Sequence, residues 1–300
     1  MKTRKLMLLI LAGAAILTSC KKDDEEPMVP STSKKAITLD ISGLEDLGSN
    51  YVYEGWIIVN GSPLSTGTFM VDGNGMLSKQ AFELNASDVD AATTFVLSIE
   101  PANDPDPAPS ATKIMAGDFN GSSANINTDL IADFSGAAGK YILATPTNGS
   151  ESNENSGIWF LDLSSGSPMK GLDLPVLPDG WKYEGWVVID GQPVTTGTFT
   201  NTMATDDDDP FSGSMPLPDV NGADGFFPGE DFLMNAPSGL SFPADIRGGM
   251  AVISVEPHPD NSPMPFTLKP LVHAIPSDAM DHTVYDMGQN LSLPTGMVSR

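Results

Sequence analysis

The feature that most constrains this 300-residue chain is a long internal repeat. Residues 53–69 begin with Tyr-Glu-Gly-Trp and end with Thr-Gly-Thr-Phe, and residues 183–199 repeat this pattern with mostly conservative differences. A match of this length predicts two copies of one module that arose by duplication. Shorter matches extend the repeat in both directions, pairing residues 39–42 with 161–164 and residues 96–101 with 252–257.

Each copy has the sequence pattern of a β-hairpin. A short apolar segment rich in β-branched residues ends at Asn60-Gly61 in the first copy and at Asp190-Gly191 in the second. These dipeptides are strong signals for a tight turn between paired strands. A second strand is expected after each turn, and no long segment beyond the N-terminus has helical spacing.

The predicted fold class is therefore all-β, with two tandem β-sandwich modules related by internal duplication. The 29 Gly and 25 Pro residues suit a turn-rich β protein. Changes in the spacing of the repeat indicate insertions in the second copy, near residues 165–178 and 202–227. The expected organisation is a cleaved signal peptide (1–19), an acidic tether (20–35), a first sandwich (36–147), a polar linker (148–157) and a second sandwich (158–300).

The N-terminus has the pattern of a lipoprotein signal peptide. Basic residues precede the apolar segment 6–17, which is shorter than the roughly 20 residues of a membrane-spanning helix. This segment leads to Leu-Thr-Ser-Cys, which resembles a bacterial lipobox with Cys20 as the lipid acceptor. Cys20 is the single cysteine, so no internal disulfide is expected. Acyl chains such as palmitate on Cys20 would hold the mature chain on a membrane. A stray cysteine in an ordinary signal peptide is the alternative.

The residues after Cys20 bear on the final location. Residues 21–26 read Lys-Lys-Asp-Asp-Glu-Glu, which resembles an export signal that sends some lipoproteins of diderm bacteria to the outer leaflet of the outer membrane. The expected location is the cell envelope, anchored to the outer membrane and exposed at the surface. A merely solvated tether is the alternative.

The repeated motifs together resemble the extracytoplasmic C-terminal domain of anti-sigma-K factors. The resemblance rests on Tyr-Glu-Gly-Trp, the turn that carries Gly and Pro, Thr-Gly-Thr-Phe, and the later Glu-Pro at residues 100–101 and 256–257. It implies a β fold and a sensing or binding role. Family members that regulate transcription also carry a cytoplasmic sigma-binding segment and a membrane-spanning helix. This sequence shows neither pattern, so no contact with a sigma factor is expected.

The charge and the absence of catalytic motifs argue against several functions. With 15 Lys+Arg against 39 Asp+Glu the net charge is −24, which disfavours binding to nucleic acid. The three histidines His258, His273 and His282 occur in the second copy only, without the spacing of a zinc site. No Gly-x-Ser-x-Gly motif accompanies them. We therefore expect no enzymatic activity and no cofactor.

Two groups of residues are candidates for binding. Trp56 and Trp186 occupy matching positions; core burial is the expected role, and an exposed platform for a sugar or peptide is the alternative. Acidic loops of the second copy offer the oxygen ligands that calcium prefers, although a solvated acidic loop is the simpler interpretation. The calcium candidates are Asp206, Asp207, Asp208, Asp209, Asp219, Asn221 and Asp224.

A second repeated pair follows the Glu-Pro motif. Glu100 precedes Lys113 at the same spacing at which Glu256 precedes Lys269. We interpret each pair as a cross-strand ion pair on two strands joined by a Pro-rich loop. A catalytic Glu activated by the Lys is the alternative.

These observations favour a non-enzymatic, lipid-anchored envelope protein that binds a ligand, senses a signal or has a structural role. The second copy, with its longer aromatic and acidic loops, is the better candidate for binding. The expected partners are the membrane, through Cys20, and an envelope protein or glycan. The alternatives are a carbohydrate-active hydrolase, a glycan-binding surface lipoprotein and a calcium-stabilised adhesin.

Overall fold

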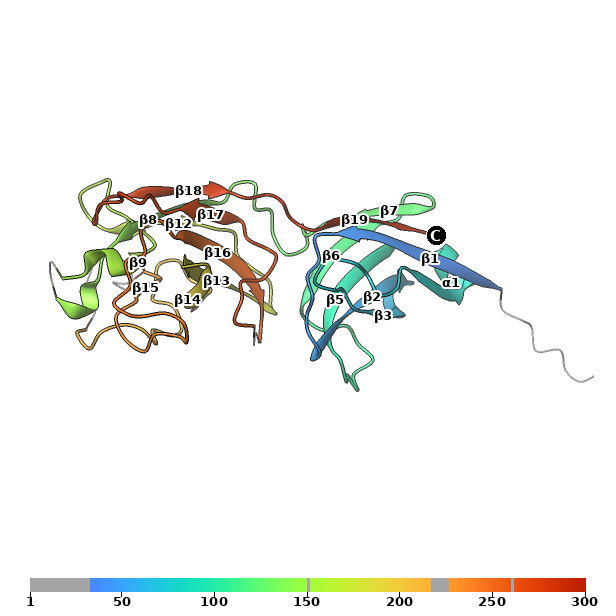
Figure 1. Cartoon of the computed structure of the whole chain (residues 1–300). Helices are drawn as coiled ribbons and strands as arrows, with labels where there is room; N and C mark the ends of the chain where they lie inside the picture. Colours follow the sequence, from blue (N-terminus) through green and yellow to red (C-terminus); the bar gives the residue numbers. More distant parts are fainter. Residues whose placement is uncertain (1–32, 150–151, 217–226, 260–261) are drawn as a thin grey trace, which may run out of the picture. The chain divides into compact units, whose positions relative to one another are not determined.

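The computed structural model describes residues 33–149, 152–216, 227–259 and 262–300. Cys20, Asp219, Asn221 and Asp224 lie outside these residues. The fold is nearly all β and antiparallel, which confirms the predicted all-β class (Figure 1). No helix among the described residues is long and apolar enough to cross a membrane. The helical elements are α1 (Ala86–Ala91) and the 3-10 turns η1 (Pro146–Asn148) and η2 (Glu154–Ser156).

The first module contains two four-stranded antiparallel sheets. Phe69 and Phe82, one from each sheet, pack together with ring centroids 6.3 Å apart, so the sheets share a core. One sheet has the order β3 (Ser62–Phe69), β2 (Tyr51–Val59), β5 (Thr94–Pro101) and β6 (Lys113–Asp118). The other has the order β4 (Ala81–Asn85), β1 (Lys34–Ser42), β19 (Thr295–Ser299) and β7 (Ser123–Ile126).

The second module is built on one nine-stranded sheet, with a separate short pair beside it. The pair consists of β10 (Leu161–Asp162) and β11 (Met169–Lys170). The large sheet has the order β14 (Gln192–Phe199), β13 (Trp181–Ile189), β16 (Met250–Pro257), β17 (Leu271–Ala274), β18 (Tyr285–Gln289), β8 (Ala138–Leu143), β9 (Gly157–Trp159) and β15 (Gly229–Asp231), with β12 (Leu172–Asp173) paired to β8.

The repeated sequence folds into the same hairpin in both modules. Tyr53 pairs with Phe69 in β2–β3 as Tyr183 pairs with Phe199 in β13–β14, and both hairpins have a bulge after the Gly of Tyr-Glu-Gly-Trp. Both turns contain two successive residues with positive φ, beginning at Asn60 and at the equivalent Asp. Asn and Asp tolerate this conformation, which a tight hairpin turn requires. The predicted strands and turns of the hairpins are confirmed.

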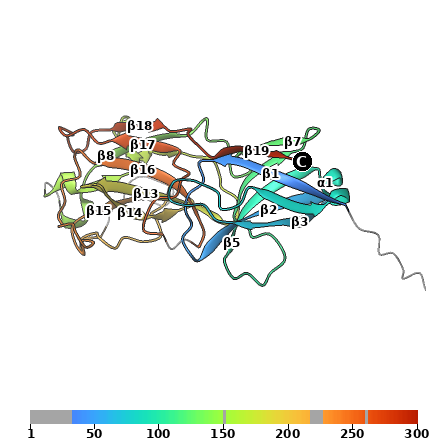
Figure 2. The same cartoon turned by 45° about the vertical axis from the view of Figure 1, so that its right-hand side comes forward.

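Each module contains a strand that the sequence-based boundaries assign to the other module. The C-terminal β19 lies between β1 and β7 of the first module. In the second module, β8 lies between β18 and β9, although it follows β7 in the sequence. Figures 1 and 2 show β19 beside β1, and β8 beside β18. The modules have therefore exchanged equivalent strands.

Because of this exchange, the boundary between the two modules differs from the boundary predicted from the sequence. The predicted linker, residues 148–157, follows β8 and reaches β9, and these two strands pair with each other. It is a loop within the second module. The chain instead crosses between the modules after β7 and again before β19. A polar, apolar-free segment marks a solvated loop, but its composition does not say whether the flanking strands belong to one sheet.

Candidate functional site

The two tryptophans of the repeat begin buried hydrogen-bond chains. Trp56 Nε1 donates to Ser98 Oγ at 2.8 Å, and Ser98 Oγ donates to Glu100 Oε1. Trp186 makes the same 2.8 Å bond to Ser254, which donates to the equivalent Glu. The indoles are 3% and 2% exposed, so both lie in the core and neither is a surface platform.

The buried glutamate of the first copy holds a loop. Glu100 Oε1 accepts from the backbone N–H of Ser110 at 2.9 Å, while Lys113 Nζ donates to the carbonyl oxygen of Ser110 at 2.7 Å. No ion pair joins Glu100 to Lys113 among the described residues. The interpretation of these two residues as a direct ion pair is therefore wrong, because Glu100 Oε1 and Lys113 Nζ bond to backbone groups of the returning loop instead.

The second copy uses the same arrangement. Glu256 Oε1 accepts from the N–H of Phe266 at 2.8 Å, and Lys269 Nζ donates to the carbonyl oxygen of Phe266 at 2.5 Å. Burial lowers the pKa of Lys269, and the charges of Glu45 and Glu256 oppose this shift. The Glu and Lys of each copy clamp the same loop residue, which is a structural role.

The acidic insertion of the second copy covers the edge strand β14. Asp207 accepts from Lys182 Nζ at 2.7 Å and from Thr198 Oγ1 at 2.8 Å, and its own N–H donates to the carbonyl oxygen of Thr198. Asp206, its neighbour, accepts from the N–H of Gly229 on β15 at 3.0 Å. The insertion is thereby bound to strands on both sides.

Behind this insertion lie two carboxylates with no exposed surface. Asp231 accepts from Trp159 Nε1 at 2.8 Å and from the N–H of Thr147 at 2.8 Å. Glu230 accepts from Ser212 Oγ and from the N–H of Phe211. Burial raises the pKa of Glu230 to about 7 and raises the pKa of Asp231, because a charged carboxylate loses its hydration there. These groups fasten loops and do not reach a ligand.

A cavity of about 200 Å³ lies between the insertion and β15, lined by Trp159 and by Asp206 to Asp209. Burial raises the pKa of Asp206 to about 9, whereas the hydrogen bond from Lys182 lowers the pKa of Asp207. Two such carboxyls could serve as acid and base. However, Asp206 binds Gly229 and Asp207 binds the β13–β14 hairpin, so the two carboxyls are held by opposite sides of the insertion.

The histidines and the described calcium candidates named from the sequence do not converge on one site. His273 bonds to Tyr141 at 2.9 Å, His282 contacts Asp281, and the backbone N–H of His258 bonds to Gly180. Within the described ranges, no group of three or more His, Cys, Asp or Glu residues could hold a metal ion. The calcium candidates Asp206 to Asp209 accordingly do not form such a group.

A cavity of about 920 Å³ lies in the second module. It is bordered by the segment after β8 through η2, by the insertion and by the loop before β18. Its lining residues are Ala144, Thr145, Pro146, Gly149, Asn153, Glu154, Asn155, Met215, Pro216, Asp281 and His282. This lining has two carboxylates, two amides and a histidine, and no Lys or Arg.

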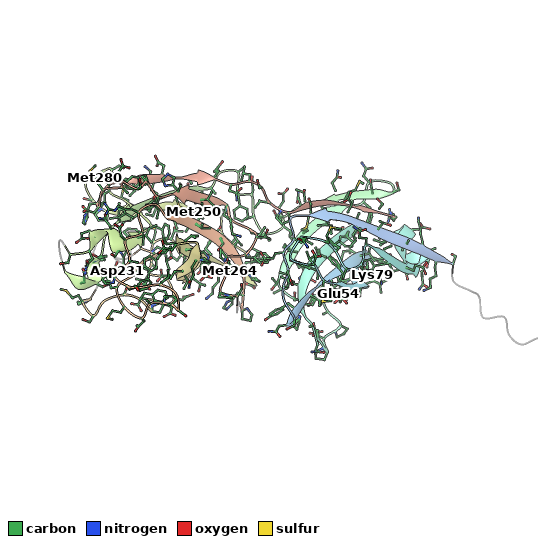
Figure 3. All side chains as sticks on the ribbon, viewed as in Figure 1. Glu54, Lys79, Asp231, Met250, Met264 and Met280 are labelled. Atoms are coloured by element: carbon green, nitrogen blue, oxygen red, sulfur yellow. The ribbon has the colours of Figure 1, made fainter. Side chains whose placement is uncertain are left out.

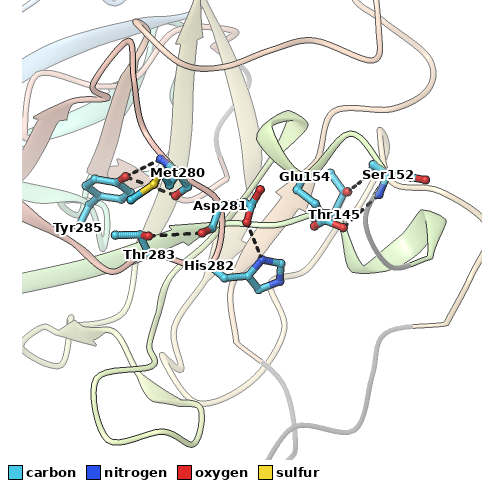
Figure 4. Close-up of polar contacts among 8 residues, drawn as sticks. All are labelled: Thr145, Ser152, Glu154, Met280, Asp281, His282, Thr283 and Tyr285. Atoms are coloured by element: carbon cyan, nitrogen blue, oxygen red, sulfur yellow. Dashed lines mark hydrogen bonds and ion pairs between the residues drawn. The ribbon is translucent and has the colours of Figure 1, made fainter.

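The polar groups on two sides of this cavity are held in place by their neighbours (Figure 4). Glu154 accepts from the N–H groups of Thr145 and Ser152, at 3.0 and 3.3 Å. His282 has a positive φ of 54°, donates its N–H to the carbonyl oxygen of Leu143, and places Nδ1 3.3 Å from Asp281 Oδ1. A non-Gly residue in this conformation is uncommon and marks a position that the surrounding structure enforces.

Sequence reasoning did not find this cavity. Thr145, Glu154 and His282 belong to no motif and come from segments far apart in the sequence. The available signal was the insertion near residues 202–227, which contributes Met215 and Pro216 to the lining. That signal indicated the module that contains the cavity, but it did not indicate the lining residues outside the insertion.

Comparison with known proteins supports the resemblance seen in the motifs. The family model described as "Anti-sigma-K factor rskA, C-terminal" matches residues 17–113. This range includes β1 to β5 and reaches the start of β6. The chain thus resembles an anti-sigma-K factor C-terminal domain over about a third of its length. No match was found among curated proteins or among solved structures.

Proposed function

We propose that this chain is a lipid-anchored, non-enzymatic binding protein of the cell envelope whose second module holds the ligand. The anti-sigma-K-like domain supports an extracytoplasmic role. The lipobox-like sequence before Cys20 supports the anchor, and the following acidic segment supports display on the outer membrane.

The observation that carries the binding role is the difference between the modules. Both contain the repeated hairpin and its clamped loop, but the 920 Å³ cavity is bordered by the insertion that only the second copy carries. Loops added to a rigid β scaffold are common places for recognition. The second module is therefore the binding module in this proposal, and the first supports it.

The lining chemistry defines the ligand class. Glu154 and Asp281 carry negative charge, the neighbouring amides and Thr145 offer hydrogen bonds, and no lining residue is Lys or Arg. Such a cavity repels sulfated and carboxylated molecules. We propose a neutral or amine-bearing glycan, whose hydroxyl and ammonium groups match these acceptors.

The binding proposal can be tested with a defined panel of oligosaccharides. We expect chitosan or malto-oligosaccharides to bind, and the double variant Asp281→Ala/His282→Ala to weaken the Kd about tenfold or more. The matched control is Asp118→Ala, an exposed acidic residue on β6 of the first module. Preference for a sulfated glycan, or unchanged binding by the double variant, would contradict the proposal.

The anchor is tested separately. Cells grown with an alkyne analogue of palmitate should label the wild-type chain and leave Cys20→Ala unlabelled. Protease added to intact cells should then degrade the wild-type chain if it is displayed on the surface. Labelling without degradation would retain the lipid anchor and place the protein on the periplasmic side.

A further inference from the structure

The distribution of methionine in this protein is unusual. Methionine normally ranks among the more buried residue types. Here, among the described residues, ten of the thirteen large apolar side chains that are exposed are methionines. They are Met70, Met76, Met169, Met203, Met215, Met234, Met250, Met264, Met280 and Met297, with exposed fractions from 36% to 68%.

The core, in contrast, contains little methionine. Its large side chains are mainly Ile, Leu, Val, Phe and Tyr. Met115, which is fully buried, and Met287, which is 8% exposed, are the only two of the described methionines in it. Thioether groups are thus concentrated where solvent reaches them and nearly absent where a change in polarity would disrupt packing.

The exposed methionines are dispersed. Met70 follows β3 in the first module, Met250 begins β16, and Met280 precedes β18 in the second. Figure 3 shows Met250, Met264 and Met280 at separate positions along the second module. A methionine-rich docking surface requires a contiguous patch, and a soft-metal site requires sulfur atoms that converge. Dispersed thioethers suit a reagent small enough to react at each sulfur separately.

We propose that the exposed methionines are sacrificial oxidation sites that consume hydrogen peroxide or hypochlorous acid at the protein surface. The sulfur lone pair attacks an oxygen of the peroxide, the O–O bond breaks, and the second oxygen leaves as water. With hypochlorous acid the sulfur also gains one oxygen, and chloride and a proton are released. In both cases the sulfur loses two electrons, the oxidant gains two, and the product is methionine sulfoxide.

The fold tolerates this reaction because of where the sulfur atoms lie. A sulfoxide on an exposed side chain remains in water, so no polar group becomes buried. Oxidation of Met115 would place a sulfoxide in a close-packed core and is expected only after unfolding. The protein can therefore take up several oxidising equivalents and keep its structure.

The test is titration of the mature chain, reconstituted in liposomes, with hydrogen peroxide. Within residues 33–300, peptide mapping should show up to ten added oxygen atoms, all on the ten exposed methionines, with Met115 unmodified and Tm changed by less than about 2 °C. Methionine sulfoxide reductases should remove these oxygen atoms. Unfolding during oxidation of the exposed set, or modification of Met115 at the same rate, would overturn the proposal.

A pair of variants separates a sacrificial role from simple reactivity. Replacing the ten exposed methionines by Leu should reduce peroxide uptake at least fivefold, while the control Met115→Leu/Met287→Leu should leave it unchanged. A methionine-containing reporter peptide tethered to the same liposomes should be protected by the wild-type chain and not by the ten-site variant. Equal loss of the reporter with both chains would also overturn the proposal. Site mapping on the wild type keeps the test decisive even if the ten-site variant misfolds.

Discussion

The β2–β3 and β13–β14 hairpins have the same register and the same bulge, yet their outer strands have different surroundings. Leu64 on β3 is 39% exposed, whereas Val194 at the equivalent position of β14 is 2% exposed. Thr198 on β14 bonds to Asp207 of the insertion, while the equivalent Thr68 is exposed. The shared motif thus sets the backbone, while the surroundings of the outer strand differ between the modules, and the inserted segment contributes to this difference at Thr198.

This contrast shows how one scaffold can supply two roles. In the first module the outer edge of the hairpin is left to solvent and the core is closed by two sheets. In the second module the insertion covers that edge and borders the large cavity. The same residues that stabilise the added segment, among them Lys182 and Asp207, therefore also hold one border of the candidate site.

The strongest test breaks the exchange of strands. Val298 on β19 is fully buried and pairs with Leu39 of β1, so Val298→Asp should lower the free energy of unfolding by about 3 kcal/mol or more. The matched control is Met297→Asp, because Met297 is exposed on the same strand; it should cost less than about 1 kcal/mol. Urea denaturation measures both. Hydrogen exchange should show the loss of protection in β1 and β7; a loss confined to β17 and β18 would contradict the exchange.

The next test uses equivalent positions of the two hairpins. Val194→Asp should destabilise the protein by about 3 kcal/mol, because it places a carboxylate in a covered site. Leu64→Asp should cost less than about 1 kcal/mol, because that side chain already contacts water. Thermal and urea unfolding of the two variants compare the values directly. Equal costs would mean that Val194 of β14 is not covered in solution.

A third test concerns pH and acts on the second module. The raised pKa of Asp206, about 9, means that the folded state keeps a proton that the unfolded state releases above about pH 4. The contribution of Asp206 to stability should therefore be fully present below about pH 4 and be lost progressively as the pH rises to about 9. Glu230 acts in the same direction up to about pH 7. In Asp206→Asn the decrease in Tm between about pH 5 and 8 should be smaller than in the wild type. An identical dependence of Tm on pH in the variant and the wild type would show that Asp206 does not cause the decrease.

The smallest expected difference lies between the two tryptophans. Trp56→Phe and Trp186→Phe each remove one buried hydrogen bond to a serine and should each cost about 1–2 kcal/mol. Because the surroundings are equivalent, the two costs should agree within about 0.5 kcal/mol. Ser98→Ala and Ser254→Ala each remove the bond to the tryptophan and the bond to the glutamate together, so each should cost more than the Trp variant of its own copy. A large discrepancy would show that the modules differ in their cores as well as at their edges.

The local structure could be predicted from the sequence because it depends on local chemistry. Asn60 and Asp190 indicated the turns, and the apolar segments before them indicated the inner strands. Core burial of Trp56 and Trp186 followed from their position within those strands.

Features that depend on distant partners could not be predicted in this way. The short strands β8 and β19 have no distinctive pattern, and their exchange is visible only from pairing. The prediction of a Glu100–Lys113 ion pair was wrong because the backbone of Ser110 bonds to both side chains. The cavity combines Glu154 and His282 through loops whose conformations are set by tertiary contacts.

The position of β19 has a consequence for biogenesis. A polypeptide is synthesised from its N-terminus, so the first module cannot acquire β19 until residues 295–299 have been made. Arg300 then secures that strand, because its guanidinium donates to the carbonyl oxygens of Val89 and Ala92 at the end of α1. Until that moment β1 and β7 present unpaired edges, which are liable to associate with other chains. Synthesis of β19, rather than emergence of residues 33–126 alone, therefore sets the time at which the first module becomes stable.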